Sequence, residues 1–307
     1  MATSLHLQGE AKRRGWLAAW AEVFKWGRCL PAALSAGFGA ILIRPVADMT
    51  LAAAILGVLL LALGCAGLNS VQESKSDGFF SRTRRRPLVT GQLNRTRVLV
   101  LSVAILAAGL TLLATGHHAP HWLPPVLGLG AYLLYNGVYT PLKPVTVLAL
   151  FPGGLAGGLP PLIGWTCSGG QLDDPRAWML VSLFFLWQIP HYCLIVLLHR
   201  QDYRTVPYPS LIRLFPETIL KGITLLWVIA FMVVALTLAG APHLLMPGPR
   251  WVLASAAILL TALMGFQLFG GWQSAGYRQM LWLFNSTFFA SMALVSGLQI
   301  LAHGVGV

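Results

Sequence analysis

Three oxygen-bearing side chains recur at every fourth position where an uncharged apolar run ends. Asn69, Glu73 and Asp77 have the spacing N-x-x-x-E-x-x-x-D. Residues four apart share a helix face, so we expect these side chains to form one stripe about two turns long. Carboxylate and amide oxygens suit Mg²⁺, which shares its other positions with water and substrate phosphates. The spacing therefore predicts that these residues bind magnesium and take part in catalysis.

A basic run, RTRRR at residues 82–86, follows this stripe. Guanidinium groups bind phosphate oxygens in pairs, so a cluster of them beside a metal site suits a diphosphate. We therefore predict Arg82 and Arg86 as diphosphate ligands, together with Lys143, the only charged residue in its loop. The alternative is that the run only orients the chain in a membrane and that the two acids are solvated.

A second polar set follows in the segment 187–203. Gln188 and His191 lie three apart within an apolar run, and Asp202 lies eleven residues beyond His191, close to the same helical face. Intramembrane polar residues are costly and usually face a cavity or a partner. We predict one helix that carries Gln188 and His191 into an acceptor cavity and has Asp202 at its mouth. The alternative is a hydrogen-bonded core histidine.

The elements that position these residues are predicted to be membrane-spanning helices. Of the 307 residues, 56% are hydrophobic and 10% are charged, and the mean hydropathy is +0.71. A soluble domain carries about 25% charge, and a helix needs around 20 apolar residues to cross a bilayer. The predicted fold is an all-α polytopic bundle of about nine helices. The nine apolar stretches lie near 24–43, 48–68, 97–115, 121–139, 145–165, 177–198, 218–240, 251–270 and 281–302.

The distribution of basic residues predicts the orientation of these spans. If the amino terminus is cytoplasmic, 18 of the 21 lysines and arginines fall on the inner side, as the positive-inside rule requires. We expect one integral domain over 1–307, with a cytoplasmic segment 1–22 and functional cytoplasmic loops 69–96 and 199–217. The net charge of +12 lies in short loops between apolar runs, which argues against binding to nucleic acid.

Four blocks of this sequence, in order, resemble a known family. The blocks are NSVQESKSDGFFSRTRRRPLVTGQL, YTPLK, GGLPPLIGW, and WQIPHY followed by RQDY. They are similar to the heme O synthases (protoheme IX farnesyltransferases), a branch of the UbiA-type intramembrane prenyltransferases. The resemblance implies a nine-helix bundle whose central cavity opens near the cytoplasmic leaflet. It also implies farnesyl transfer from farnesyl diphosphate to a vinyl group of protoheme (heme B), which gives heme O.

The resemblance also assigns roles to single residues. The implied metal and catalytic set consists of Asn69, Glu73, Asp77 and Asp202 with Mg²⁺. The implied diphosphate ligands are Arg82, Arg86, Lys143 and Arg200. The implied acceptor residues are Gln188, His191 and Tyr203, and His191 either ligates the heme iron or orients a propionate. The expected location is the cell inner membrane, and the expected protein partners are heme A synthase or terminal oxidase assembly proteins.

Other functions stay open at this point. A prenyltransferase that acts on a quinone precursor or another aromatic acceptor would share the first block. A non-catalytic paralogue that binds heme or isoprenoid is a second alternative, because residues 204–210 depart from the family pattern. A transporter is a third, although it has no reason to gather acids and arginines on one side of the membrane.

Overall fold

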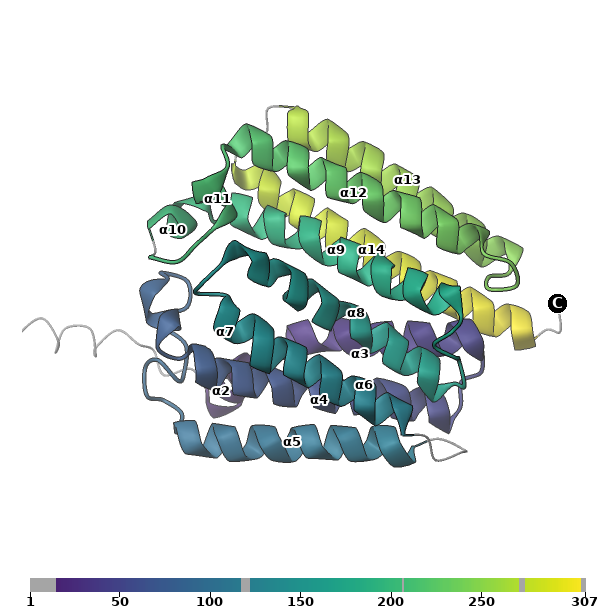
Figure 1. Ribbon diagram of the computed structural model, residues 1–307, viewed down its shortest axis with the longest axis horizontal. Coiled ribbons are helices and arrows are strands. Elements are labelled where there is room, and N and C mark those ends of the chain that lie inside the picture. Colours follow the sequence, from purple (N-terminus) through teal and green to yellow (C-terminus); the bar gives the residue numbers. More distant parts are fainter. Residues whose placement is uncertain (1–14, 117–121, 206, 271–273, 305–307) are drawn as a thin grey trace, which may run out of the picture.

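The chain folds into helices throughout the residues that the structure describes. The structure is a computed structural model, and it describes residues 15–116, 122–205, 207–270 and 274–304 (Figure 1). The helices, in chain order, are α2 (Trp16–Val23), α3 (Trp26–Ile43), α4 (Met49–Glu73), η1 (Ser76–Phe79), α5 (Arg95–Thr115), α6 (Leu123–Tyr132), η2 (Leu133–Tyr139), α7 (Thr140–Leu142), η3 (Val147–Ala149), α8 (Leu150–Cys167), α9 (Pro175–Leu198), α10 (Arg200–Thr205), α11 (Leu211–Leu214), α12 (Glu217–Gly240), α13 (Pro247–Phe269) and α14 (Ser274–Gly304).

Within the described residues, eight helices are long and apolar enough to cross a bilayer. Their outer faces expose large apolar side chains such as Val100, Leu226 and Phe266, as expected for a chain whose solvent is lipid. The chain is therefore an integral, multi-pass membrane protein, and the all-α prediction is confirmed. The remaining predicted span, 121–139, corresponds to the consecutive helices α6, η2 and α7. The π-helical η2 divides this run into short pieces.

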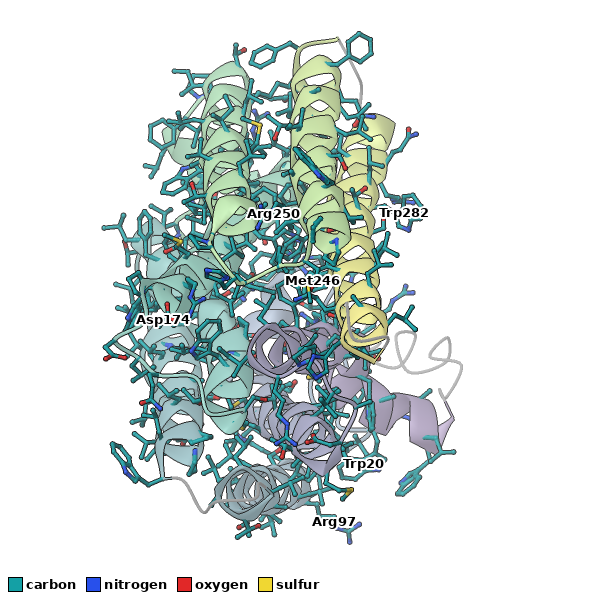
Figure 2. All side chains as sticks on the ribbon, turned by 90° about the vertical axis from the view of Figure 1, so that its right-hand side faces the viewer. Trp20, Arg97, Asp174, Met246, Arg250 and Trp282 are labelled. Atoms are coloured by element: carbon teal, nitrogen blue, oxygen red, sulfur yellow. The ribbon has the colours of Figure 1, made fainter. Side chains whose placement is uncertain are left out.

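The helices are arranged in successive layers (Figure 1). Helix α5 lies on one outer side and packs on α4, and α4 packs on α3. Helix α8 contacts α3 and α6 on one side and α9 on the other, and α14 contacts both α3 and α9. Helices α12 and α13 complete the opposite side. When the bundle is viewed from the end that carries Asp174 and Arg250, side chains fill the space between the helices (Figure 2).

Helices α3 and α8 touch through their backbones. A Cβ atom added to Gly39 would lie 1.9 Å from the carbonyl oxygen of Pro161, and one added to Gly164 would lie 1.7 Å from that of Ala36. Small residues allow such close approach in membrane helices, where packing replaces the hydrophobic driving force. The contact holds α8 against the amino-terminal helices, where α8 forms one wall of the cavity described below.

The predicted cytoplasmic segment 1–22 contains part of a short helix, α2. Its Ala19 and Val23 are buried with Val71 of α4 and Val98 of α5. Trp16 on the same helix is 68% exposed. Helix α2 thus packs on the ends of α4 and α5 at the end of the bundle that holds the predicted site.

Candidate functional site

A cavity of ≈ 340 Å³ runs between α3, α4, α8, α9 and the η2 segment. Its basic lining residues are Lys25, Arg28 and Lys143. Its aromatic and amide lining residues are Tyr135, Tyr139, Gln188, His191 and Tyr192. The rest of its wall is mostly small or apolar, with contributions from α4 and from the glycine-rich part of α8. The cavity therefore joins a cationic region to an apolar one.

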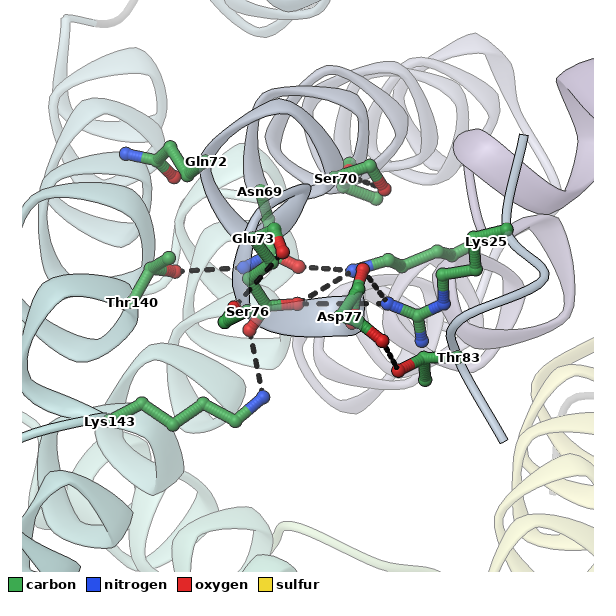
Figure 3. A network of polar contacts seen from close by, with 12 residues as sticks. Lys25, Asn69, Ser70, Gln72, Glu73, Ser76, Asp77, Thr83, Thr140 and Lys143 are labelled. Atoms are coloured by element: carbon green, nitrogen blue, oxygen red, sulfur yellow. Dashed lines mark hydrogen bonds and ion pairs between the residues drawn. The ribbon is translucent and has the colours of Figure 1, made fainter. Parts of the chain in front are cut away.

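Behind the cationic region, Glu73 accepts contacts from three basic residues (Figure 3). Lys143 Nζ donates a hydrogen bond to Glu73 Oε1 at 2.8 Å. Lys25 Nζ lies 3.6 Å from Glu73 Oε2, and an Arg86 guanidinium nitrogen lies 3.9 Å from the same oxygen. That guanidinium also donates to Asp77 Oδ2 at 2.6 Å. The predicted residues Glu73, Asp77, Arg86 and Lys143 thus form one ion-pair network.

The expectation that Asn69, Glu73 and Asp77 line one helix is wrong. Helix α4 ends at Glu73, and Asp77 lies on the separate 3₁₀ helix η1. The hydroxyls of Ser74 and Ser76 donate to carbonyl oxygens three residues back. Serine hydroxyls compete for backbone groups in this way and favour the ends of helices. Asp77 still points toward Arg86, because the hydroxyl of Thr83 donates to the Asp77 carbonyl oxygen at 2.7 Å and fixes the turn.

Sequence reasoning missed Lys25 as a site residue. Its ammonium donates to Asn69 Oδ1, and its side chain is only 4% exposed. Lys25 has a left-handed backbone (φ 52°), which is uncommon for a residue with a side chain and occurs at functional sites. Burial lowers the pKa of Lys25 to about 7. In the sequence, Lys25 is one of the basic residues whose distribution predicts the membrane orientation. Its place at the start of the first span, on the same side as the acids, was the available signal.

Asp202 and Tyr203 contact the arginine-rich segment instead of continuing α9. Helix α9 ends at Leu198, so the prediction of one helix from His191 to Asp202 is wrong. At His199 the backbone leaves the α-helical conformation (φ −108°, ψ 30°), and the chain changes direction. Ser81 Oγ then donates to both Asp202 carboxylate oxygens, at 2.8 and 3.0 Å, and Arg82 donates to the Tyr203 hydroxyl at 3.3 Å. These bonds join segments that lie 121 residues apart.

The donor set at this end of the bundle suits a hard cation. Asn69, Glu73 and Asp77 supply an amide oxygen and two carboxylates, and oxygen ligands of this kind suit Mg²⁺. In the described ranges, no three His, Cys, Asp or Glu side chains lie close enough together to hold one metal ion. Lysine and arginine groups take up the oxygens of Glu73 and Asp77 instead. The four-residue magnesium site that includes Asp202 therefore stays a prediction.

Arg200 lies away from the cavity. Its guanidinium is 3.5 Å from Glu217 of α12, and Glu217 also accepts a hydrogen bond from the Tyr277 hydroxyl at 2.7 Å. Arg200 thus links α10 to α12, and it is not among the residues that line the cavity. The structure places it in a contact between helices, whereas the sequence suggested a diphosphate ligand.

The other region of the cavity contains His191 and Gln188. His191 Nδ1 forms a hydrogen bond with Asn285 Oδ1 at 2.9 Å, and its ring stacks on Trp187 with 5.0 Å between the centroids. Gly157 leaves room for Gln188, because a Cβ at residue 157 would lie 2.3 Å from Gln188 Nε2. Both predicted residues therefore line the cavity. Asn285 was missed because it is 94 residues from His191 and lies in a mostly apolar helix.

The chain is similar in sequence to two protoheme IX farnesyltransferases. A protoheme IX farnesyltransferase from Geobacter sulfurreducens is 43% identical over 176 residues, which are 57% of this chain and 64% of that protein. The aligned region is thus less than two thirds of that relative. A protoheme IX farnesyltransferase from Nitratidesulfovibrio vulgaris is 32% identical over 240 residues, 78% of this chain and 83% of that protein.

The fold is shared with a solved structure. A UbiA homologue from Archaeoglobus fulgidus, bound to GPP and Mg²⁺, has a TM-score of 0.65 and 15% identity over 90% of this chain and 99% of that chain. At this identity the similarity concerns the fold alone. The profile of the UbiA prenyltransferase family matches residues 29–292 of this chain. Because that match covers most of its length, the chain belongs to the UbiA prenyltransferase family.

Proposed function

We propose that the protein transfers a farnesyl group from farnesyl diphosphate to a vinyl group of heme B, giving heme O. The observation that carries the proposal is a cavity that joins the cationic region around Lys25 and Lys143 to an apolar region lined by small residues. A prenyl diphosphate has the same division into a charged head and an apolar chain. The names of the two farnesyltransferase relatives support this activity and this acceptor.

The charge of the ion-pair network supports an anionic ligand. Among the residues that the structure describes, Glu73 and Asp77 are the acids that pair with Lys25, Arg86 and Lys143, so the basic groups outnumber the acidic ones. Arg28 adds a further positive charge at the cavity. Excess charge removed from water is costly unless it is paired. A diphosphate would supply the missing negative charge, and a prenyl diphosphate with Mg²⁺ is bound to the related Archaeoglobus fulgidus structure.

The reaction begins with departure of the diphosphate. Asn69, Glu73 and Asp77 would hold Mg²⁺, and the bound ion would supply positive charge to the leaving diphosphate. Lys143, Lys25 and Arg86 bind the remaining oxygens and stabilise the negative charge that develops as the allylic C–O bond breaks. The apolar wall keeps water away from the allylic carbon until the π bond of the acceptor attacks it and the new C–C bond forms. The carbocation left on the acceptor beside the porphyrin ring then takes up one water molecule and loses a proton, which gives the hydroxyl of heme O. A vinyl group is a weak nucleophile, so its placement beside that carbon governs the rate.

The acceptor occupies the region of Gln188 and His191. The bond to Asn285 and the stack on Trp187 fix the His191 ring, so that it presents one face of a rigid site to the porphyrin. Tyr203, the third predicted acceptor residue, is not among the residues that line the cavity, and its hydroxyl accepts a hydrogen bond from Arg82. We further propose that this end of the bundle faces the cytoplasm of a cell whose inner membrane holds the protein. Heme A synthase or terminal oxidase assembly proteins are the protein partners that we propose.

The test is product formation by the purified protein. The full chain in detergent is incubated with Mg²⁺, farnesyl diphosphate and heme B, and the hemes are analysed by mass spectrometry. We expect heme O from the unchanged chain and none from Asp77→Ala. The matched control, Asp174→Asn, lies at the other end of the bundle and retains activity. Heme O formation by a folded Asp77→Ala protein would remove the metal role, and a prenylated aromatic with no heme O would reassign the acceptor.

A further inference from the structure

Three residues on the cavity wall recur at every fourth position in the segment that contains the π-helix. Tyr135, Tyr139 and Lys143 all line the cavity. On a regular α-helix of 3.6 residues per turn, each such step drifts by about 40°, so Lys143 would lie about 80° around the helix from Tyr135. The segment Leu133–Tyr139 is π-helical, and the backbone N–H of Thr140 donates to the Tyr135 carbonyl oxygen five residues back. The wider π turn opposes the drift and keeps the three side chains on one face.

Two side chains hold this π turn against α4. Asn136 is 3% exposed, and its Nδ2 donates to the Cys65 carbonyl oxygen at 3.1 Å and to Gln72 Oε1 at 3.0 Å. Gln72 Nε2 in return donates to the Asn136 carbonyl oxygen at 2.9 Å. A π turn releases backbone groups from the regular α-helical pattern, and within a membrane these groups need internal partners. Gln72 supplies one of them, so the pair stabilises the π turn itself.

A second contact joins α4 to α7, which directly follows η2 and lies nearer to Lys143. The Thr140 hydroxyl donates to the Tyr135 carbonyl oxygen at 2.8 Å and accepts a hydrogen bond from Asn69 Nδ2 at 3.0 Å (Figure 3). Asn69 and Gln72 both lie on α4, as does Glu73, the partner of Lys143. Hydrogen bonds from α4, the helix that carries Glu73, thus fix the position of the π turn.

We propose that Asn136, with Gln72, is a positioning residue for Lys143. The Asn136–Gln72 pair keeps η2 π-helical, and the π turn directs the Lys143 ammonium to Glu73 and to the cavity. Without the pair, the segment relaxes toward an α-helix, and Lys143 rotates away from the place where a diphosphate binds. This inference rests on the proposed function, in which Lys143 binds the diphosphate of the substrate.

A double-mutant cycle tests the proposal, with inorganic pyrophosphate and Mg²⁺ as the probe. Binding to the detergent-purified full chain is measured by titration calorimetry for Asn136→Leu, Lys143→Met and the double variant. Loss of a charged hydrogen bond predicts that Lys143→Met weakens binding roughly 10-fold or more. We expect Asn136→Leu to weaken it severalfold and the double variant to bind no worse than Lys143→Met alone, because residues that act through one group are not additive.

Other results would contradict either the role of Asn136 or the role of Lys143. Additive losses in the double variant, or unchanged binding by Asn136→Leu, would end the positioning role of Asn136. Unchanged binding by Lys143→Met would instead remove the diphosphate role on which the inference rests. Gln72→Leu serves as the second variant if Asn136→Leu does not fold, because residue 72 lies at a more exposed position. Thr111→Leu on the exposed face of α5 is the control and leaves pyrophosphate binding unchanged.

Discussion

The ammonium of Lys143 donates a 2.8 Å hydrogen bond to the carboxylate of Glu73, although 70 residues separate them along the chain. Lys25 and Arg86 approach the same carboxylate at 3.6 and 3.9 Å. One acid therefore holds three segments of the chain together at the candidate site. Its removal should affect both stability and the proposed reaction.

Glu73→Gln should destabilise the protein and abolish turnover. It leaves Lys25 and Lys143 near a neutral amide, and loss of one partner of a buried ion pair costs about 3 kcal/mol or more. Thermal unfolding in detergent and heme O formation measure the two effects. Glu73→Asp, which keeps the carboxylate, is the control and should retain both stability and measurable activity. An unchanged melting temperature for Glu73→Gln would show that the network contributes little to stability.

Removal of divalent metal should stop the reaction without unfolding the protein. The oxygens of Glu73 and Asp77 are paired with Lys143 and Arg86, so the acids have partners before any metal binds. Addition of a chelator should abolish heme O formation, and excess Mg²⁺ should restore it. The melting temperature should change little in the chelated sample. Unfolding on chelation would instead indicate a structural metal, because such sites fold only with their ion.

Arg86→Met and Arg200→Met should differ in their effect on substrate binding. Arg86 joins the network around Glu73 and Asp77, whereas Arg200 pairs with Glu217 between α10 and α12. Loss of a charged contact to the diphosphate should weaken binding by roughly 10-fold or more for Arg86→Met. Arg200→Met should change pyrophosphate affinity less than about twofold, since a partly exposed ion pair contributes little. Equal losses in both variants would restore Arg200 as a diphosphate ligand.

Gly164→Val should prevent normal packing of α8 on α3. The added Cβ would lie 1.7 Å from the Ala36 carbonyl oxygen, a backbone atom that cannot rotate away. Forced overpacking typically costs about 1–3 kcal/mol, and a clash with a fixed backbone atom places this variant at the upper end of that range. The expected result is a lower melting temperature and a low yield of folded protein. Gly222→Ala on α12, where no atom lies within 4 Å of the added Cβ, is the matched control and should fold normally.

Asp174→Ala should lower stability in a pH-dependent way. The Asp174 carboxylate caps α9 and accepts hydrogen bonds from the side chain of Arg176, and these bonds lower the pKa of Asp174 below its ordinary value. Loss of a cap costs about 1 kcal/mol. The pKa of Asp174 is lower in the folded protein than in the unfolded chain, so the ionised carboxylate stabilises the fold at any pH above the unfolded pKa. This stabilisation is lost as the pH falls through the pKa of the folded protein. The difference between the two proteins should therefore shrink below about pH 4, as thermal unfolding can measure.

Much of the fold could be predicted because the hydrophobic runs are long. A helix that crosses lipid needs about 20 apolar residues in a row, so each span can be recognised in the sequence. Helices α3, α4 and α9 correspond to predicted runs. The exception is the run 121–139, where η2 is π-helical. Hydropathy reports length and apolarity and carries no information about which backbone hydrogen bonds form. The π turn depends on Gln72, which the sequence places on another helix.

The site could be predicted only in part. Glu73, Asp77, Arg86 and Lys143, which form one ion-pair network, could be singled out because charge is rare in this chain and their types suggest chemistry. Lys25 and Asn285 were missed because their roles come from tertiary contacts with Asn69 and His191. The prediction that one helix continues from Asn69 to Asp77 was wrong because it rested on the regular spacing alone. Helix α4 ends at Glu73, where the hydroxyls of Ser74 and Ser76 donate to backbone carbonyl oxygens.

The contact of Lys25 with Asn69 has a consequence for the thermodynamics of ligand capture. A lysine side chain loses about 2 kcal/mol of rotamer freedom when it is fixed in one geometry. The fold already immobilises Lys25, since its side chain is 4% exposed and its ammonium is held by Asn69 and Glu73. That entropy is lost when the chain folds, so an arriving anion does not have to order this side chain again. Association at this end of the bundle should therefore carry a smaller entropic penalty than at a surface patch of mobile lysines.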